Sequence, residues 1–510
     1  MKMHRQSLVI FFVLILSAIA VLATAATALA IATKNIAVSK VTSTSAVIVI
    51  ETDVASDVTV DYGQASGVYT GSASGTNAIR HEIALSSLIP SANVFYRLTI
   101  TDAADPATSI TIPEKFFHTA HFSGEPFSFA AAGDHRPNSD TTVQPAMWGT
   151  IVGQMTGEGL DLALNVGDII YGTGSDSLAQ NVAKYQGMFA VTTQLTSSTP
   201  MYVAAGNHER LNYADSRAGF EQEFTFPVNN GASAATEGEH YYSFDNGDTH
   251  FIALSTEIPG QEGMITGSQK AWLEQDLAAN EEPWIVVFMH RPLFSGQHGG
   301  DPWVNLSNTA GQQNKADIHA LFLQYGVDVV LEGHDHYYLR HVEDGIQYII
   351  TGGGGAPVSG TPALGPGDVF GAGVYEHVKV DETSSSLTIS ALDSTGVTLE
   401  SFALTMPELS LTLDKAYWAN LADYQNNVLS ANFTLVNSGA GGASNINVES
   451  LSASGDVAVL TSTPFSLGSL AASASMDTTV TYQVPQGVAT FLSTFRATCT
   501  DDRGFTYAYP

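Results

Sequence analysis

Short runs of alternating apolar and polar residues occupy both ends of the chain. In the segment 33–120 they include 45–51, 58–62 and 94–100, and Gly, Asn, Asp and Pro separate them. A period of two with such frequent breaks predicts a small antiparallel β-sandwich. The same alternation returns over 407–510 in a Ser-, Thr- and Ala-rich stretch that contains no histidine. This segment is predicted to form a second β-sandwich with a structural or attachment role.

The pattern changes over 124–405. Strongly apolar segments at 127–132, 162–166, 284–289 and 327–331 alternate there with segments of helical periodicity. One of these predicts a helix over 268–277 with Ser268 as its cap. Strands buried on both faces and interleaved with helices indicate a layered α/β domain. The chain is therefore predicted to be multidomain, with an N-terminal sandwich, a central α/β domain and a C-terminal sandwich.

The first 30 residues are predicted to be a targeting segment. Lys2 and Arg5 give a positive start, residues 8–32 carry no charge, and 28–30 read Ala-Leu-Ala. A small-x-small pattern after an apolar run suits signal peptidase, so cleavage is expected. An uncleaved membrane anchor is the alternative, because the uncharged run could span a bilayer. Both interpretations predict export, to a secreted, cell-surface or periplasmic location.

Composition narrows the classes of partner. The 510 residues include 19 Lys and Arg against 50 Asp and Glu, for a formal charge of −31, and 44% of the residues are hydrophobic. The apolar content excludes a disordered chain, while the acidity argues against nucleic acid and anionic membrane surfaces. A small phosphate ester is expected instead of a polyanion. Cys499 is the one cysteine of the sequence, so an internal disulfide is impossible.

The central region contains five motifs with polar donors, and four of them directly follow apolar strands. In chain order they are Gly133-Asp134-His135-Arg136, Gly167-Asp168-Ile169-Ile170-Tyr171, Gly206-Asn207-His208-Glu209, Val287-Phe288-Met289-His290 and Gly333-His334-Asp335-His336. The carboxyl ends of strands are where open α/β sheets bind ligands. Carboxylates, an amide oxygen and imidazoles together suit iron, manganese or zinc, and glycine before a donor allows a sharp turn. Each motif alone would be weak, since such pairs are mostly ordinary turns.

The order GD, GDxxY, GNHE, VxxH and GHxH resembles the purple acid phosphatase branch of the calcineurin-like metallophosphoesterases. The resemblance covers about 33–405, because larger members of that family carry a fibronectin-III-like sandwich before the catalytic domain. The segment 241–254 is also similar to the strands of the family. The resemblance implies an αββα four-layer catalytic domain.

The resemblance also implies a ligand set for two metals. Fe(III) would be held by Asp134, Asp168, Tyr171 and His336. Asp168 would bridge to a divalent Zn, Fe or Mn ion that Asn207, His290 and His334 also hold. The wider superfamily has a ligand His two residues after the first Asp, where this chain has Arg136. The Tyr171 phenolate would compensate, unless Tyr171 merely packs over the site.

By the same resemblance the reaction would be attack of a metal-bridging hydroxide on the phosphorus of a monoester. His208 would contact the phosphate or protonate the leaving group. Glu209 would either orient His208 or be an ordinary surface carboxylate. His298 is the candidate for a second substrate contact, with loop decoration as its alternative. His135 is expected to support the site rather than face substrate.

Three other features remain open. Arg136 and Arg291 flank metal motifs and could bind phosphate oxygens or neutralise the acidic ligands. The glycine-rich segment 351–357 lacks the Lys of a phosphate loop, so close backbone packing is expected there. His118 and His121 have ligand spacing but lie in a connector, and we interpret that spacing as coincidence.

The sequence thus predicts an exported phosphatase of phosphate monoesters. A phosphodiesterase or nucleotidase on the same scaffold is the enzymatic alternative, since the loops that select substrate are not interpretable. A surface or adhesion protein with a vestigial metal site is the non-enzymatic alternative, and its C-terminal module would bind the cell surface.

Overall fold

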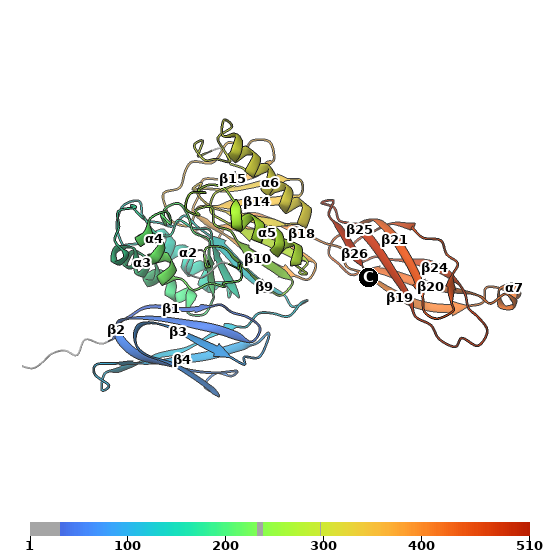
Figure 1. Ribbon diagram of the computed structural model, residues 1–510, viewed down its shortest axis with the longest axis horizontal. Coiled ribbons are helices and arrows are strands. Elements are labelled where there is room, and N and C mark those ends of the chain that lie inside the picture. The colour runs from blue at the N-terminus through green and yellow to red at the C-terminus, as the bar shows by residue number, and fades with distance from the viewer. Residues whose placement is uncertain (1–30, 232–237, 296, 510) are drawn as a thin grey trace, which may run out of the picture.

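The computed structural model describes residues 31–231, 238–295 and 297–509, and the predicted targeting segment 1–30 lies outside these ranges. Strands alone form the N-terminal region, helices and strands form the central region, and the C-terminal region is again mostly strands (Figure 1). Among the described helices, none combines the length and the apolar character needed to cross a bilayer.

The N-terminal region is one antiparallel sheet. Its strands are β1 (Thr33–Ser39), β2 (Ser45–Gly63), β3 (Gly71–Ser86), β4 (Asn93–Asp102) and β5 (Ser109–His118). They follow the order β1-β2-β4-β5, with β3 also paired to β2. The two separate strands expected at 45–51 and 58–62 are one continuous strand, so that expectation was wrong. Register shifts around Ser56 absorb the residues between the two runs, as β-bulges do, without ending the strand.

Two sheets form the central region. The six-stranded sheet, ordered β18-β17-β16-β6-β7-β8, contains β6 (Phe127–Ala132), β7 (Leu162–Asn165), β8 (Met201–Val203), β16 (Glu376–Thr383), β17 (Ser386–Asp393) and β18 (Thr398–Thr405). The seven-stranded sheet, ordered β15-β13-β14-β12-β11-β10-β9, contains β9 (Tyr242–Asn246), β10 (Thr249–Ala253), β11 (Trp284–Phe288), β12 (Val329–Glu332), β13 (Tyr338–Glu343), β14 (Ile346–Thr351) and β15 (Asp368–Ala372). Strands β6, β7 and β8 are mutually parallel, as are β10, β11, β12 and β14.

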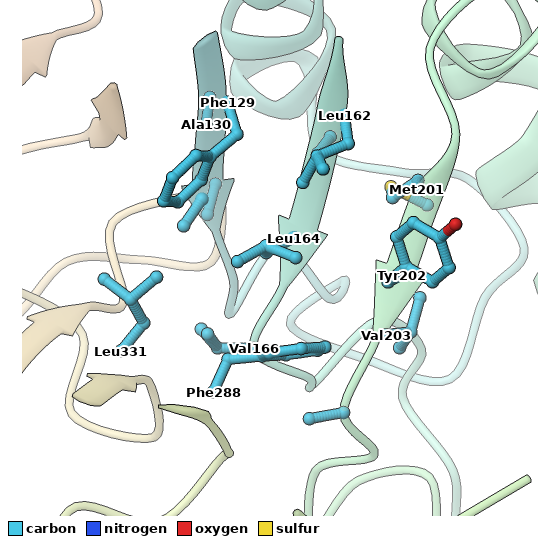
Figure 2. Packing of buried hydrophobic residues seen from close by; sticks show 14 of the residues in the cluster. Phe129, Ala130, Leu162, Leu164, Val166, Met201, Tyr202, Val203, Phe288 and Leu331 are labelled. Atoms are coloured by element: carbon cyan, nitrogen blue, oxygen red, sulfur yellow. The ribbon is translucent and has the colours of Figure 1, made fainter. Parts of the chain in front are cut away.

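The two sheets share one hydrophobic core. Figure 2 shows Leu164 and Val166 of the six-stranded side close to Phe288 and Leu331 of the other sheet. The helices are α2 (Ala146–Gly157), α3 (Leu178–Thr196), α4 (Ala214–Glu223), α5 (Gly267–Ala279) and α6 (Thr309–Tyr325). Helices α2, α3 and α4 pack with the six-stranded sheet, and α5 and α6 with the seven-stranded sheet. The layers therefore run helix, sheet, sheet, helix, as the resemblance implies.

Helix α5 corrects one detail of the sequence prediction. Its N-cap residue is Thr266, which makes no side-chain cap hydrogen bond, and Ser268 lies inside the first turn. The predicted Ser268 cap was wrong: the cap lies two residues earlier, because Gly267 adopts a φ of 56° that glycine takes without a Cβ clash.

The C-terminal region contains two four-stranded sheets. They are β19 (Leu409–Tyr417), β20 (Val428–Asn437), β24 (Ser475–Gln483) and β22 (Ala458–Val459), then β23 (Phe465–Leu470), β21 (Ala443–Ala453), β25 (Ser493–Thr500) and β26 (Thr506–Tyr509). The short helix α7 (Leu421–Gln425) precedes β20. Phe433 of one sheet and Phe495 of the other meet with ring centroids 4.8 Å apart. Arg503 contacts Asp328 and so ties this region to the central one.

Candidate metal centre

The carboxyl ends of five parallel strands bring the predicted donors to one edge of the central region. Asp134 follows β6, Asp168 follows β7, Asn207 follows β8, His290 follows β11 and His334 follows β12. Parallel strands end at a common edge, so residues far apart in the chain become neighbours there.

The donors converge on a buried cluster. Ligand atoms of Asp134, Asp168 and His290 lie within 4.8 Å of one another. His290 Nε2 lies 3.4 Å from Asp168 Oδ1, 3.0 Å from Asn207 Oδ1 and 3.2 Å from His334 Nδ1. Carboxylate, amide and imidazole donors therefore share one small volume, which matches the donor chemistry of a transition metal.

His336 lies beside Asp134, and Tyr171 lies beside His208 and Arg136. His336 Nε2 is 3.6 Å from Asp134 Oδ1. Asp134 Oδ1 is buried and accepts no hydrogen bond from a described residue. An anionic oxygen buried in this way is costly unless a cation balances it, so the cluster fits a bound metal. The Tyr171 ring lies 5.2 Å from the ring of His208 and 5.6 Å from Arg136 Cζ.

Three of the predicted ligands have a strained backbone. Asp134, Asp168 and His334 adopt left-handed φ angles of 54°, 55° and 70°. Such strain in residues other than glycine concentrates at functional sites, where the surrounding structure holds it. The preceding glycines permit close approach, since a Cβ on Gly333 would lie 2.4 Å from Asp134 Oδ2.

The electrostatics of the cluster favour a cation. Burial and the charge of Asp168 raise the pKa of Asp134, and burial lowers the pKa of His290 to about 3. Burial would also raise the pKa of Asp168, but His290, His208 and Arg136 outweigh it and lower that pKa. A neutral imidazole beside two crowded carboxylates offers a lone pair where positive charge is needed.

Glu209 supports the Asp168 turn from inside the protein. Its side chain is fully buried and accepts backbone N–H bonds from Asp168 at 3.0 Å, Ile169 at 2.8 Å and Ile170 at 3.2 Å. The surface-carboxylate alternative was therefore wrong. These bonds come from the turn that carries Asp168, so Glu209 positions that turn.

His135 also lies inside the protein. Its ring stacks on Trp148 with centroids 3.8 Å apart, and its nitrogens contact Gln144 and Asn165 at 3.1 and 2.9 Å. It is fully buried, so it supports the motif and does not face substrate.

His208 and Arg136 both contact Asp168. The His208 backbone N–H donates to Asp168 Oδ1 at 2.8 Å, and its Nε2 lies 4.0 Å from Asp168 Oδ2. Arg136 Nε is 3.2 Å from the same Oδ2. Burial lowers the pKa of His208 to about 4. Both side chains therefore border the cluster next to Asp168, with 15% and 13% of their side chains exposed.

Two aspartates that sequence reasoning missed contact two histidines of the site. Asp301 Oδ2 lies 3.0 Å from His334 Nε2, and Asp335 Oδ1 lies 2.5 Å from His298 Nδ1. The His298 ring is 4.0 Å from that of His334, and 42% of its side chain is exposed. Asp335 stands inside the GHxH motif and could have been noticed, whereas no sequence pattern marks Asp301.

The Arg291 side chain forms ion pairs with two carboxylates. Its guanidinium donates to Glu257 at 2.6 and 3.1 Å and to Asp301 at 2.5 Å. It therefore neutralises Asp301, the residue that contacts His334.

The glycine-rich segment 351–357 packs tightly beside Asp134, as expected. The Gly354 N–H donates to Gly133 O at 2.9 Å, and the Ala356 N–H donates to Asp134 O at 2.8 Å. A Cβ on Gly354 would lie 2.3 Å from Gly133 O, so backbone contact requires glycine here.

Comparison with known proteins agrees with this geometry. Residues 135–338 match the family of calcineurin-like phosphoesterases. Purple acid phosphatase 15 of Arabidopsis thaliana is 28% identical over 55% of this chain and 54% of its own length. Acid phosphatase type 7 of Homo sapiens is 32% identical over 35% of this chain and 40% of its own length. The chain thus spans about half the length of the curated relatives it matches.

A solved structure is similar in fold. The purple acid phosphatase from yellow lupin (Lupinus luteus) seeds superposes with a TM-score of 0.61, at 18% identity and with 74% of each chain covered. The strand-end donors, the layered sheets and the sequence matches agree. The chain therefore contains a calcineurin-like phosphoesterase domain, and over this region it is homologous to the purple acid phosphatases.

Proposed function

We propose that this protein is an exported dinuclear-metal phosphatase that hydrolyses phosphate monoesters. The observation that carries the proposal is the convergence of donors from five strand ends on the buried pair Asp134 and Asp168. The homology to purple acid phosphatases supports the same reaction class.

The donors divide into two sets around Asp168. Fe(III) would be held by Asp134, Asp168, Tyr171 and His336, and a divalent Zn, Fe or Mn ion by Asp168, Asn207, His290 and His334. When bound, the two cations would activate water and neutralise charge on the phosphoryl oxygens. Asp134 Oδ1 accepts no hydrogen bond within the described part of the chain, and this and the raised pKa of Asp134 support a cation at the first position.

The residues around the cluster would bind and orient the ester. His208, held through its backbone by Asp168, would contact the phosphate or donate a proton to the leaving oxygen. His298, oriented by Asp335, would make a second contact from the exposed rim. Arg136 would stabilise phosphoryl charge next to Asp168. Arg291 would act indirectly, by holding Asp301 against His334.

The remaining assignments extend this proposal to the whole chain. We assign 33–120 as a fibronectin-III-like β domain, 124–405 as the catalytic domain and 407–510 as an accessory sandwich with a cell-surface role. The charge pattern of 1–30 supports export, whether that segment is cleaved or retained. The net charge of −31 supports small esters over nucleic acids as substrates.

The decisive experiment compares hydrolysis of p-nitrophenyl phosphate and bis-p-nitrophenyl phosphate by protein loaded with iron and zinc. Faster cleavage of the monoester is expected. Faster cleavage of the diester would assign the protein to the phosphodiesterases. If neither ester is cleaved although two metals are bound, the surface-protein alternative replaces the enzyme.

A further inference from the structure

A second cluster of metal-type ligands lies away from the candidate catalytic centre. His118 ends β5, His121 lies in the connector that follows, and Asp161 immediately precedes β7. Ligand atoms of these three residues lie within 4.8 Å of one another. The sequence interpretation of His118 and His121 as coincidence overlooked Asp161, because it joins them only through the packing of two regions.

The cluster is distant from the catalytic donors along the sheet. Asp161 lies at the amino end of β7, whereas Asp168 lies beyond its carboxyl end. The four-residue strand between them spans about 13 Å. The two sets of ligands are therefore independent.

Two of the three side chains are each oriented through one atom and offer another. His118 Nδ1 contacts Thr119 O at 2.7 Å, so its N–H is used there and Nε2 keeps a lone pair. Asp161 Oδ2 accepts the Ser128 N–H at 3.0 Å, which leaves Oδ1 free to face His121. Such contacts to backbone groups are how proteins fix the tautomer and orientation of metal ligands.

His121 completes the arrangement. Its Nε2 lies 3.1 Å from Asp161 Oδ1 but is not aligned for a hydrogen bond to any described residue. In a tetrahedral zinc site neighbouring ligand atoms are about 3.3 Å apart, so this spacing suits ligands of one ion. Its backbone N–H donates to Asn246 Oδ1 at 3.0 Å, and 11% of its side chain is exposed.

The two imidazoles face each other closely. Their centroids are 4.1 Å apart and their planes differ by 16°. The ring-nitrogen lone pairs lie in the ring planes, so binding one ion would require one of the two rings to turn out of this stack.

A small cavity adjoins the ligands. Its volume is about 10 Å³, and its lining includes His118, His121, Asp161 and Tyr202. This is the room that one water molecule or ion occupies. Two imidazoles, one carboxylate and one further position match the coordination preference of zinc.

We propose that His118, His121 and Asp161 bind a structural Zn²⁺ ion that fastens the end of β5 to the start of β7. The ion would join the N-terminal region to the central region and take no part in the phosphatase reaction. This proposal does not depend on the proposed function.

The test titrates metal-free full-length protein with Zn²⁺, using Asp168→Asn to disable the catalytic centre. The Asp168→Asn protein should retain one tight equivalent of zinc, and adding His121→Gln should weaken that site at least about a hundredfold. The matched control is His319→Gln, because His319 also contacts a carboxylate, Asp344, at 3.1 Å and belongs to no described ligand cluster. Unchanged zinc binding in the His121→Gln variant would overturn the proposal.

Two further measurements keep the test valid if that variant folds poorly. In the unmodified protein, zinc should protect His118 and His121, but not His319, from diethyl pyrocarbonate. Zinc should also raise the melting temperature of Asp168→Asn but not of Asp168→Asn combined with Asp161→Asn. Equal modification of the three histidines with and without zinc would contradict the site.

In otherwise unmodified protein, His121→Gln should hydrolyse p-nitrophenyl phosphate at the unmodified rate, whereas loss of turnover would contradict a purely structural role.

Discussion

The backbone N–H of His334 donates a hydrogen bond of 2.8 Å to Oδ2 of Asp134, although the two residues are 200 positions apart. Both residues have left-handed backbones, and both follow glycine. The bond uses one oxygen of Asp134 to fix the turn that presents His334. The other oxygen, Oδ1, accepts no hydrogen bond from a described residue and lies 3.6 Å from His336 Nε2. One carboxylate thus organises the site and stays available to a cation.

Asp168→Asn should remove metal bridging. We expect at least about one metal ion per chain fewer than in the wild type and at least about a thousandfold loss of p-nitrophenyl phosphate turnover, because the bridging charge is gone. Metal analysis and steady-state kinetics measure both. Asp317→Asn, which changes an exposed partner of Lys270, is the control and should behave as wild type. Wild-type turnover by Asp168→Asn would contradict the bridging assignment.

Tyr171→Phe should bleach the violet colour that a phenolate on Fe(III) would give the iron-loaded protein. The hydroxyl is the only group removed, so the visible spectrum reports directly on ligation. Tyr213→Phe is the control, since 46% of Tyr213 is exposed. An unchanged spectrum in Tyr171→Phe would show that Tyr171 packs over the site without binding metal.

Gly333→Ala should disturb the centre through backbone packing. Its new Cβ would lie 2.4 Å from Asp134 Oδ2, and we expect a loss of about 1–3 kcal/mol in the free energy of unfolding, with reduced metal content. Gly153→Ala in α2 is the matched control, because no described atom outside its own helix backbone lies within 4 Å of the added Cβ. That helical substitution should instead stabilise by about 0.5–1 kcal/mol. Urea unfolding distinguishes the two, and equal effects would refute the packing argument.

Glu209→Gln should loosen the Asp168 turn. The amide nitrogen would face backbone N–H groups that now donate to a carboxylate, and we expect a cost of about 1–3 kcal/mol in stability. Metal affinity should fall about 10–100-fold, since Glu209 orients a ligand without binding the ion itself. Isothermal titration measures this, with the exposed Glu281→Gln as control. Unchanged metal affinity would show that Glu209 is dispensable for positioning.

His250 should make stability depend on pH above neutrality. Burial would lower its pKa, but hydrogen bonds to Asp245 and Asp276 outweigh burial and raise that pKa to about 9. The folded state therefore holds the proton more tightly than the unfolded state. Its stabilising contribution is fully present below about pH 6.5 and disappears as the pH rises through about 9.

Urea unfolding of wild type and His250→Gln tests this dependence. The stability difference between the two proteins should shrink by about 1–3 kcal/mol from about pH 6 to about pH 10. A difference that stays constant over this range would mean that His250 is not charged in the folded protein.

The sequence predicted the strand-end donors because the relevant signals are local. Strand β6 has the predicted bounds, and Asp134 follows it after a single glycine. A short apolar run, a glycine and a donor define a strand end without reference to the rest of the chain. The same local signals misjudged β2, since a bulge inside a strand looks like a break between two strands.

The amino-acid sequence by itself determined the order of the elements, the β character of both flanking regions and the set of donors at the strand ends. Only the tertiary structure decided that Glu209 lies beneath the Asp168 turn, that Asp301 meets His334, and that Asp161 joins His118 and His121. The physical reason is the range of the interactions. Periodicity and turns act between near neighbours in the chain, whereas burial and ligand geometry arise from packing between segments that the sequence separates widely.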